Sequence, residues 1–270
     1  MGRAWISWGR VGALQAANQP GRFLEHKTNY QQLGESERVV SEPDDVDERA
    51  RPRVASAAVM SEHAARYAFA LGLVGNRHVL DLGCGAGYGT EMLSWTAASV
   101  RGFDLWIPDS TEQIAWPHGR EFFYGHDLCA SRLPEADAAI MFEVLEHLSD
   151  AAGALEHVFH SVQSLICSFP NPDYHGSTSN QYHVNDWPLP RLERELRSAA
   201  RRSGRTDPTL THLHQRPGEA LIRPGRNAYA AYWLVVADTS AHPIIKTPER
   251  KPPLWRLRQR VRLRSRLGLR

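Results

Sequence analysis

The chain has 270 residues, of which 42% are hydrophobic and 23% are charged. These fractions are typical of globular proteins, so a collagen-like or wholly disordered chain is excluded. The length suits one large domain or two small ones. No run of residues approaches the roughly 18 to 20 consecutive apolar positions that a membrane-spanning helix needs, so we expect no transmembrane segment.

The amino-terminal residues and the cysteines indicate a cellular compartment. The first twenty residues are interrupted by Arg3 and Arg10, and they lack the apolar core of a secretory signal. The three cysteines, Cys84, Cys129 and Cys167, are too few and too scattered for a disulfide scaffold. We therefore expect a cytoplasmic protein in a reducing environment.

The net charge of +2 conceals two parts of opposite charge. From Lys246 onward there are ten Lys or Arg residues and one acid, Glu249, which gives that segment a charge of +9 and leaves −7 for the rest. We predict that residues 241–270 form a basic tail. Nucleic acid, an acidic membrane surface or an acidic partner protein would suit such a charge, as would a tail that is merely solvated.

Residues 1–55 show no sustained hydrophobic period and are predicted to be a polar extension. An amphipathic helix follows, with Ser61 as the expected N-cap and Gly75 as the expected stop. The apolar residues of its predicted buried face recur at the spacing i, i+3, i+4 and i+8. They are Ala65, Ala68, Phe69 and Leu73.

Strands and helices alternate after this helix. Strands are expected at residues 78–82, 99–104, 122–126, 138–142, 165–169, 209–214 and 232–237. Helices are expected at residues 90–98, 143–159 and 190–203. Because parallel strands are joined by right-handed crossovers, this alternation predicts a parallel sheet with helices on both faces. The last two strands have no helix between them, so an antiparallel strand is expected there.

The strongest functional signal is the segment VLDLGCGAGYGT at residues 79–90. Its glycines, at every second position after a strand and before a helix, let the backbone turn tightly and approach a ligand closely. The dinucleotide fingerprint G-x-G-x-x-G is not met. The pattern that is met is acid-x-G-x-G-x-G, and it consists of Asp81, Gly83, Gly85 and Gly87.

Two further acids follow predicted strands. Asp104 ends the second strand, about 20 residues beyond the glycines, as a ribose-binding carboxylate requires. Asp127 follows the third strand. Ligands of open parallel sheets bind at the carboxyl ends of the strands, so we expect these acids and Asp81 to meet at one edge. Such an edge suits a cationic ligand better than a pyrophosphate.

These motifs resemble those of the class I S-adenosylmethionine-dependent methyltransferases. The resemblance extends over residues 60–240 and includes EVLEHL at residues 143–148, which looks like a bacterial subset of the family. It implies an α/β, Rossmann-like, doubly wound sheet of seven strands with the last strand antiparallel, in a domain at residues 56–240. It also implies S-adenosylmethionine as the cofactor, whose activated methyl group is transferred to an acceptor held nearby.

The resemblance also implies roles for individual residues. The methionine and ribose end of the cofactor would be lined by the glycine motif: Asp81, Gly83, Gly85 and Gly87. Asp104 would accept hydrogen bonds from the ribose hydroxyls. Asp127 and Leu128 would meet the adenine, and Glu143 would lie beside the methionine part and the sulfonium.

Residues 168–187 are predicted to bind the acceptor, because long irregular loops rich in polar and aromatic residues usually serve as lids or binding loops. The sequences S-x-P-N and N-x-Y-H in this stretch look like those of family members that modify sugars or other small hydroxylated molecules. We therefore expect the hydroxyl of a small molecule or glycan as the acceptor. His147 or His183 would act as general base, and activation by proximity alone stays open.

A metal-assisted alternative rests on the sequence E-x-x-E-H. On a helix beginning at Glu143, this residue, Glu146 and His147 would share one face, and His183 would supply a fourth ligand. The set resembles the metal site of small-RNA 3′-terminal 2′-O-methyltransferases and suits Mg²⁺ or Mn²⁺. A metal is not favoured, because EVLEHL is common among metal-free members. The alternative functions are thus a metal-dependent RNA ribose 2′-O-methyltransferase and a non-catalytic, donor-binding scaffold.

Overall fold

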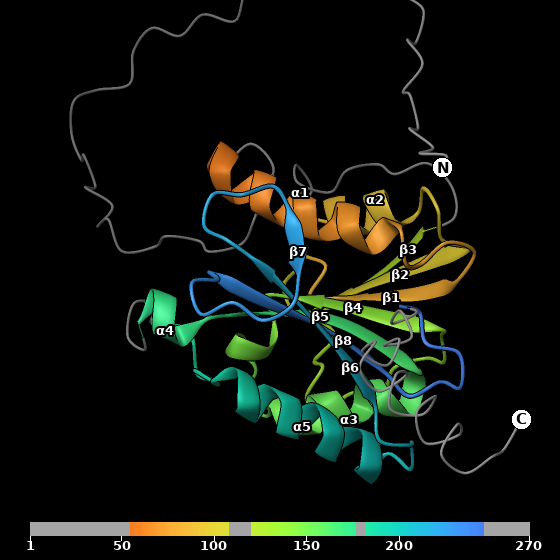
Figure 1. Cartoon of the computed structure of the whole chain (residues 1–270). Helices are drawn as coiled ribbons and strands as arrows, with labels where there is room; N and C mark the ends of the chain where they lie inside the picture. The colour runs from red at the N-terminus through yellow and green to blue at the C-terminus, as the bar shows by residue number, and fades with distance from the viewer. Residues whose placement is uncertain (1–54, 108–119, 177–181, 246–270) are drawn as a thin grey trace, which may run out of the picture. The chain divides into compact units, whose positions relative to one another are not determined.

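The computed structural model describes residues 55–107, 120–176 and 182–245, in which one β-sheet is covered by helices on both faces (Figure 1). The predicted polar extension lies outside these residues except for Ala55, and so does the basic tail beyond residue 245. The domain boundaries at residues 55 and 240 therefore stay predictions. None of the described helices has the length and apolar character needed to cross a membrane.

The sheet of the described residues has eight strands in the order β3-β2-β1-β4-β5-β8-β6-β7. Their bounds are β1 His78–Leu82, β2 Ser99–Asp104, β3 Arg120–Tyr124, β4 Ala138–Phe142, β5 Ser164–Pro170, β6 Thr209–Gln215, β7 Ile222–Pro224 and β8 Tyr232–Asp238. Strands β1 to β5 are parallel to one another, and β8 runs antiparallel to both β5 and β6. The Rossmann-like sheet and its antiparallel strand are confirmed. The predicted count of seven is wrong, because the three-residue β7 pairs along the edge of β6.

The helices are α1 Ala57–Leu71, α2 Tyr88–Leu93, η1 Leu145–His147, α3 Ala151–Ser161, α4 Pro172–His175 and α5 Leu189–Arg202. Helices α1 and α2 cover one face of the sheet, and α3 and α5 cover the other (Figure 1). The N-cap of α1 is Ser56 rather than the predicted Ser61. Helix α2 ends at Leu93 rather than at Ala98. The single helix predicted after β4 is divided into η1, which is a 3₁₀ turn, and α3.

Helix α1 buries a different face from the predicted one. Arg66, Tyr67 and Ala70 are buried, whereas Ala68 is exposed and Phe69 is only half-buried. The apolar spacing could not reveal this face, because two of its residues carry polar groups. Arg66 and Tyr67 are buried together with hydrogen-bond partners from other elements. The buried face of α1 therefore carries polar atoms toward the carboxyl edge of the sheet.

Candidate cofactor and acceptor site

The glycine loop, residues 83–87, joins β1 to α2 and adopts a backbone that disfavours other residues. Gly83, Gly85 and Gly87 have φ angles of +75°, +54° and +86°, and in this left-handed region a Cβ is penalised. Gly83 has a second requirement, because a Cβ there would overlap a methyl group of Val144. The turn thus favours glycine at all three positions, and close packing adds a second requirement at Gly83 alone.

Asp104 is hydrogen-bonded to this loop. One carboxylate oxygen, Oδ2, accepts a hydrogen bond from the backbone N–H of Gly85 at 2.7 Å. The other, Oδ1, accepts one from the N–H of Trp106 at 2.8 Å. Asp104 is half-buried and directly follows the strand interior at the carboxyl end of β2. The protein's own backbone therefore holds together the loop and the acid that the family resemblance assigns to the ribose.

Asp81 lies within β1 and is only 1% exposed. Its Oδ1 accepts a hydrogen bond from the Tyr67 hydroxyl at 3.1 Å, and its Oδ2 accepts one from the Thr90 hydroxyl at 2.6 Å. Burial raises the pKa of Asp81 to about 6, and the charge of Asp104 adds to this, although the two hydrogen bonds oppose it. Both oxygens thus anchor α1 and α2 to the sheet, while direct contact with the cofactor stays a prediction.

Tyr67 packs against the start of α2. A Cβ on Gly89 would overlap the Tyr67 ring, and that ring lies edge-on to Tyr88 and Phe142, at centroid distances of 5.6 and 5.1 Å. The sequence pattern did not single out Tyr67 or its role. Gly89, a glycine beyond the motif, is a signal for this packing, because it marks a position where a large neighbour leaves no room for a side chain.

Asp127 and Leu128, which were predicted to meet the adenine, follow β3. Asp127 is half-buried, and its Oδ1 accepts a hydrogen bond from the N–H of Cys129 at 2.8 Å. Leu128 is 6% exposed and packs in the core, with its carbonyl accepting a hydrogen bond from Nδ1 of His157 at 3.3 Å. The pair is therefore rigidly held near the carboxyl end of the sheet, and its adenine role stays a prediction.

Glu143 follows β4 directly and has a left-handed backbone, with φ at +54°. A residue other than glycine in this region carries a penalty of roughly 1 to 2 kcal/mol, and such outliers concentrate at functional sites. The hydroxyl of Ser168 donates to Oε1 of Glu143 at 2.6 Å, and Oγ of Ser168 accepts a hydrogen bond from the backbone N–H of Glu143 at 3.1 Å. Ser168 is fully buried in β5, so it fixes both the backbone and the carboxylate of Glu143.

The metal alternative assumed a helix that begins at Glu143, and this helix does not form. Glu143 precedes the short turn η1 and does not share a face with Glu146 and His147. The fold instead gathers Glu146, His147 and His183, with one ligand atom of each within 4.8 Å of the others. Glu146 is buried, His183 is half-buried and His147 is exposed. Three of the four residues of the predicted metal set therefore meet, and Glu143 is held by β5.

The end of the loop predicted to bind the acceptor, residues 182–187, is hydrogen-bonded to η1. The N–H groups of Val184 and Asn185 both donate to the Glu146 carbonyl, at 2.8 and 3.1 Å. The side-chain amide of Asn185 donates to the carbonyls of Leu145 and Leu148, at 2.9 and 2.7 Å. These bonds bring a loop residue, His183, to the turn that carries His147. Residues 177–181 of the same loop, including Asn180 of the N-x-Y-H sequence, lie outside the described residues.

The two histidines form an edge-to-face pair. Their ring centroids are 4.9 Å apart, with an angle of 75° between the planes. Nδ1 of His147 lies 3.2 Å from the carbonyl oxygen of Tyr182. Because a carbonyl oxygen can only accept, this nitrogen carries the proton, and in the neutral ring Nε2 keeps a lone pair. His147 is thus oriented either to take a proton or to bind a cation through Nε2.

The model of the family described as "Methyltransferase domain" matches residues 48–216, which is more than half of the chain. The chain belongs to the class I S-adenosylmethionine-dependent methyltransferases. S-adenosylmethionine is the cofactor of this family, as the resemblance implied. A comparison with curated proteins gives no match.

Solved structures of methyltransferases share this fold. A chain of the complex between the Haloferax volcanii Trm112 methyltransferase activator and a methyltransferase is 14% identical, with a TM-score of 0.51, 68% of this chain covered and 95% of that one. An S-adenosylmethionine-dependent methyltransferase from Thermotoga maritima is 13% identical, with a TM-score of 0.51, 67% and 91% coverage. One from Mesorhizobium loti is 21% identical, with a TM-score of 0.49, 66% and 97% coverage. At these identities the first two support the fold alone.

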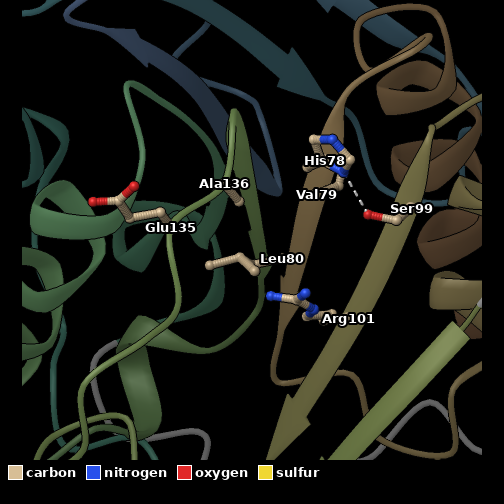
Figure 2. A pocket seen from close by; sticks show the side chains of 7 residues that line it. All are labelled: His78, Val79, Leu80, Ser99, Arg101, Glu135 and Ala136. Carbon is tan, nitrogen blue, oxygen red and sulfur yellow. Dashed lines mark hydrogen bonds between the residues drawn. The ribbon is translucent and has the colours of Figure 1, made fainter.

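The methyltransferase also has a small hollow at the opposite edge of its sheet, shown in Figure 2. It is lined in part by His78, Ser99, Arg101 and Glu135, from the starts of β1 and β2 and from the segment before β4. Nδ1 of His78 and the Ser99 hydroxyl are hydrogen-bonded at 2.7 Å. Because the glycine loop follows the other end of β1, this hollow is separate from the candidate site.

Proposed function

We propose that this methyltransferase methylates a hydroxyl oxygen of a small molecule or glycan, as a member of the bacterial subset with the EVLEHL sequence. The observation that carries the proposal is the pairing of His147 with His183, 4.9 Å apart between ring centroids. A general base beside the acceptor would assist the methylation of a hydroxyl by accepting its proton. The cytoplasmic location stays a prediction.

The cofactor would lie along the carboxyl edge of the sheet. In this proposal the glycine loop meets its methionine and ribose end, Asp104 accepts hydrogen bonds from the ribose hydroxyls, and Asp127 and Leu128 meet the adenine. Glu143 would lie beside the sulfonium. Two features support this arrangement: the hydrogen bond that ties Asp104 to the loop, and the left-handed backbone that directs Glu143 away from the path of β4.

The reaction breaks the bond between sulfur and methyl carbon while a bond forms between that carbon and the acceptor oxygen. The donor becomes the neutral thioether, and the hydroxyl proton must leave. A hydroxyl is about as weak an acid as water, with a pKa of ~15.7, so a histidine assists by accepting the proton within the transition state. Nε2 of His147 is suited to this role because the Tyr182 carbonyl holds the proton of the ring on Nδ1.

A second candidate is the metal-dependent 2′-O-methylation of an RNA ribose. The observation that favours it is the cluster of Glu146, His147 and His183, whose ligand atoms lie within 4.8 Å of one another. A carboxylate and two imidazoles can hold a divalent cation, and such a cation would lower the pKa of a bound hydroxyl. The +9 tail would attract a polyanion, and it lies outside the described residues.

A screen with radiolabelled S-adenosylmethionine tests both candidates. Pools of small hydroxylated molecules, glycans and RNA would be incubated with the enzyme, with and without a chelator. Labelling of a small molecule or glycan that survives chelation supports the proposal. Labelling of RNA alone that is lost on chelation supports the second candidate, and donor binding without labelling of any pool supports a scaffold. The same screen on the variant His147→Ala tests the proposed general base. The matched control is His160→Ala, because His160 is an exposed histidine on α3.

A further inference from the structure

Helix α1 carries a buried guanidinium whose charge the described residues leave without an ion pair. Arg66 is 0% exposed, and its Nη1 donates to Oε1 of Gln215 at 2.8 Å. Its Nε and Nη2 are buried and have no hydrogen-bond partner among the described residues. A buried charge lacking a counter-ion and hydrogen bonds is costly. The protein therefore keeps Arg66 in a state that an incoming anion would stabilise.

The orientation of this guanidinium is fixed. Gln215 is fully buried, and its amide nitrogen donates to the carbonyls of Glu62 and Glu219, at 3.1 and 2.8 Å. Its amide oxygen therefore must face Arg66. The Tyr232 ring lies over the guanidinium, with its centroid 4.5 Å from Cζ of Arg66. One nitrogen is thus tied and one face is covered, which leaves the edge formed by Nε and Nη2.

That edge has the geometry of a carboxylate receptor. Nε–H and one N–H of Nη2 point the same way in the guanidinium plane, and two such parallel donors bind the two oxygens of a carboxylate at once. The two nitrogens without partners are the pair that makes this bidentate contact. A single carbonyl or a water would have to share one oxygen between them and would bring no charge, whereas a carboxylate offers one oxygen to each nitrogen and supplies the missing charge.

Arg66 lies on the side of the sheet where the cofactor is expected. Tyr232 pairs in register with Pro170, at the carboxyl end of β5, and with Gln215, at the carboxyl end of β6. Burial raises the pKa of Tyr232, and the negative charge of Glu143 raises this pKa further, whereas the positive charge of Arg66 lowers it. The charges of Glu143 and Arg66 therefore both act on the Tyr232 hydroxyl. Tyr67, the next residue of α1, donates a hydrogen bond to Asp81 of β1, the strand that the glycine loop follows.

We infer that Arg66 binds the α-carboxylate of the methionine part of S-adenosylmethionine. The cofactor carries two cationic groups, the sulfonium and the amine, together with one carboxylate. The edge of the sheet offers mostly acids to the cationic groups, and Arg66 is the one buried Lys or Arg among the described residues. Because the guanidinium is sealed from water, a covering side chain has to move when the carboxylate enters, as side chains at binding sites commonly do.

Calorimetry with decarboxylated S-adenosylmethionine tests this inference on the wild-type protein. This analogue keeps the nucleoside, the sulfonium and the amine but lacks the carboxylate. The loss of a bidentate, charge-assisted contact should weaken its binding roughly 10- to 100-fold relative to S-adenosylmethionine. If Arg66 did not contact the carboxylate in the wild-type protein, the analogue should bind the acidic edge at least as tightly as S-adenosylmethionine does, because the analogue carries one more net positive charge. Equal or tighter binding of the analogue overturns the inference.

The variant Arg66→Met identifies the residue responsible. It should lose the same roughly 10- to 100-fold for S-adenosylmethionine and less than about 2-fold for the decarboxylated analogue, whose missing group is the one that Arg66 contacts. An equal loss on both ligands would show a structural role, and unchanged affinity for S-adenosylmethionine would show that Arg66 does not contact its carboxylate. Either result rejects the inference. Arg101→Met is the matched control, because Arg101 pairs with Glu121 on the exposed surface. These titrations measure binding alone, so they do not depend on the proposed acceptor or on the histidines.

Discussion

The backbone N–H of Gly85 donates to the carboxylate of Asp104 at 2.7 Å, across 19 residues of sequence. Strands β1 and β2 are parallel, with Leu82 opposite Phe103, so the residues that follow these two positions meet at the same edge. The glycine loop and the acid assigned to the ribose are consequently one unit. A change at Asp104 should alter the loop as well as remove a ligand for the cofactor.

Asp104→Ala is therefore expected to weaken the binding of S-adenosylmethionine by roughly 100-fold or more, because contacts to the two ribose hydroxyls are charge-assisted and each is worth about 1.5 kcal/mol or more. Isothermal calorimetry measures this affinity directly. Glu135→Ala is a suitable control, because Glu135 is exposed at the opposite edge of the sheet. Unchanged affinity in the Asp104 variant would remove the residue from the cofactor site.

Glu143→Gln should separate the charge of Glu143 from its hydrogen bond. Glutamine can still accept from the Ser168 hydroxyl, so the position of the side chain is kept. Binding of the cationic S-adenosylmethionine should weaken about 10-fold, since a close charge contact near a protein surface is worth 1 kcal/mol or more. Binding of S-adenosylhomocysteine, whose sulfur is neutral, should change much less. Equal losses for the two ligands, measured by calorimetry, would contradict a contact with the sulfonium.

Gly89→Ala should destabilise the fold by roughly 1 to 3 kcal/mol, because the added methyl group overlaps the Tyr67 ring and overpacked cores lose about this much. The displaced ring would also strain the hydrogen bond from Tyr67 to Asp81. Gly75→Ala is the control, since a Cβ there meets no atom within 4 Å and its φ is not positive. Denaturant titrations that find equal stability for both variants would contradict the packing of Tyr67 against α2.

The pH dependence of stability should carry the signature of Asp81. Burial raises the pKa of Asp81 from 3.8 to about 6 in the folded protein, so the folded state binds this proton more tightly than the unfolded state does. The resulting stabilisation is complete below pH ~4 and is lost as the pH rises through ~6. The difference amounts to roughly 3 kcal/mol, at 1.36 kcal/mol for each unit of pKa.

Asp81→Asn removes this titration. Denaturant titrations between pH 4 and 7.5 should therefore show the stability of the wild type falling relative to that of the variant, by roughly 2 to 3 kcal/mol. The same pH profile in both proteins would mean that the Asp81 carboxylate does not resist ionisation in the folded state.

The sequence predicts the fold well where the local signal and the global arrangement agree. The acid-x-G-x-G-x-G pattern located the loop correctly, because each of its three glycines has a positive φ that other residues rarely adopt. Asp104 falls beside the loop because the alternation of strands and helices makes the sheet parallel. The antiparallel last strand follows from the family resemblance, and strand β7 was not predicted because its three residues are too few to show an alternation.

Other features depend on contacts between distant segments, which no periodicity encodes. Arg66 is not among the apolar residues of the predicted buried face of the helix, yet it is buried with a hydrogen bond to Gln215, 149 residues away. Because the backbone at Glu143 is left-handed, no α-helix begins there as E-x-x-E-H suggested. The short turn η1 follows instead, and helix α3 begins at Ala151. His183 could be named as a partner of His147, but their contact relies on the hydrogen bonds of Val184 and Asn185 to η1.

The identity of the methylated atom tests the central claim most directly. Mass spectrometry of the product formed from labelled S-adenosylmethionine would locate the methyl group, and the same assay would be run on His147→Ala and His183→Ala. We predict a methyl ether on a small molecule or glycan. At least one of the two variants should lose roughly 100-fold or more in turnover while binding the donor like the wild type. Methylation of nitrogen or carbon, or undiminished turnover in both variants, would contradict the account.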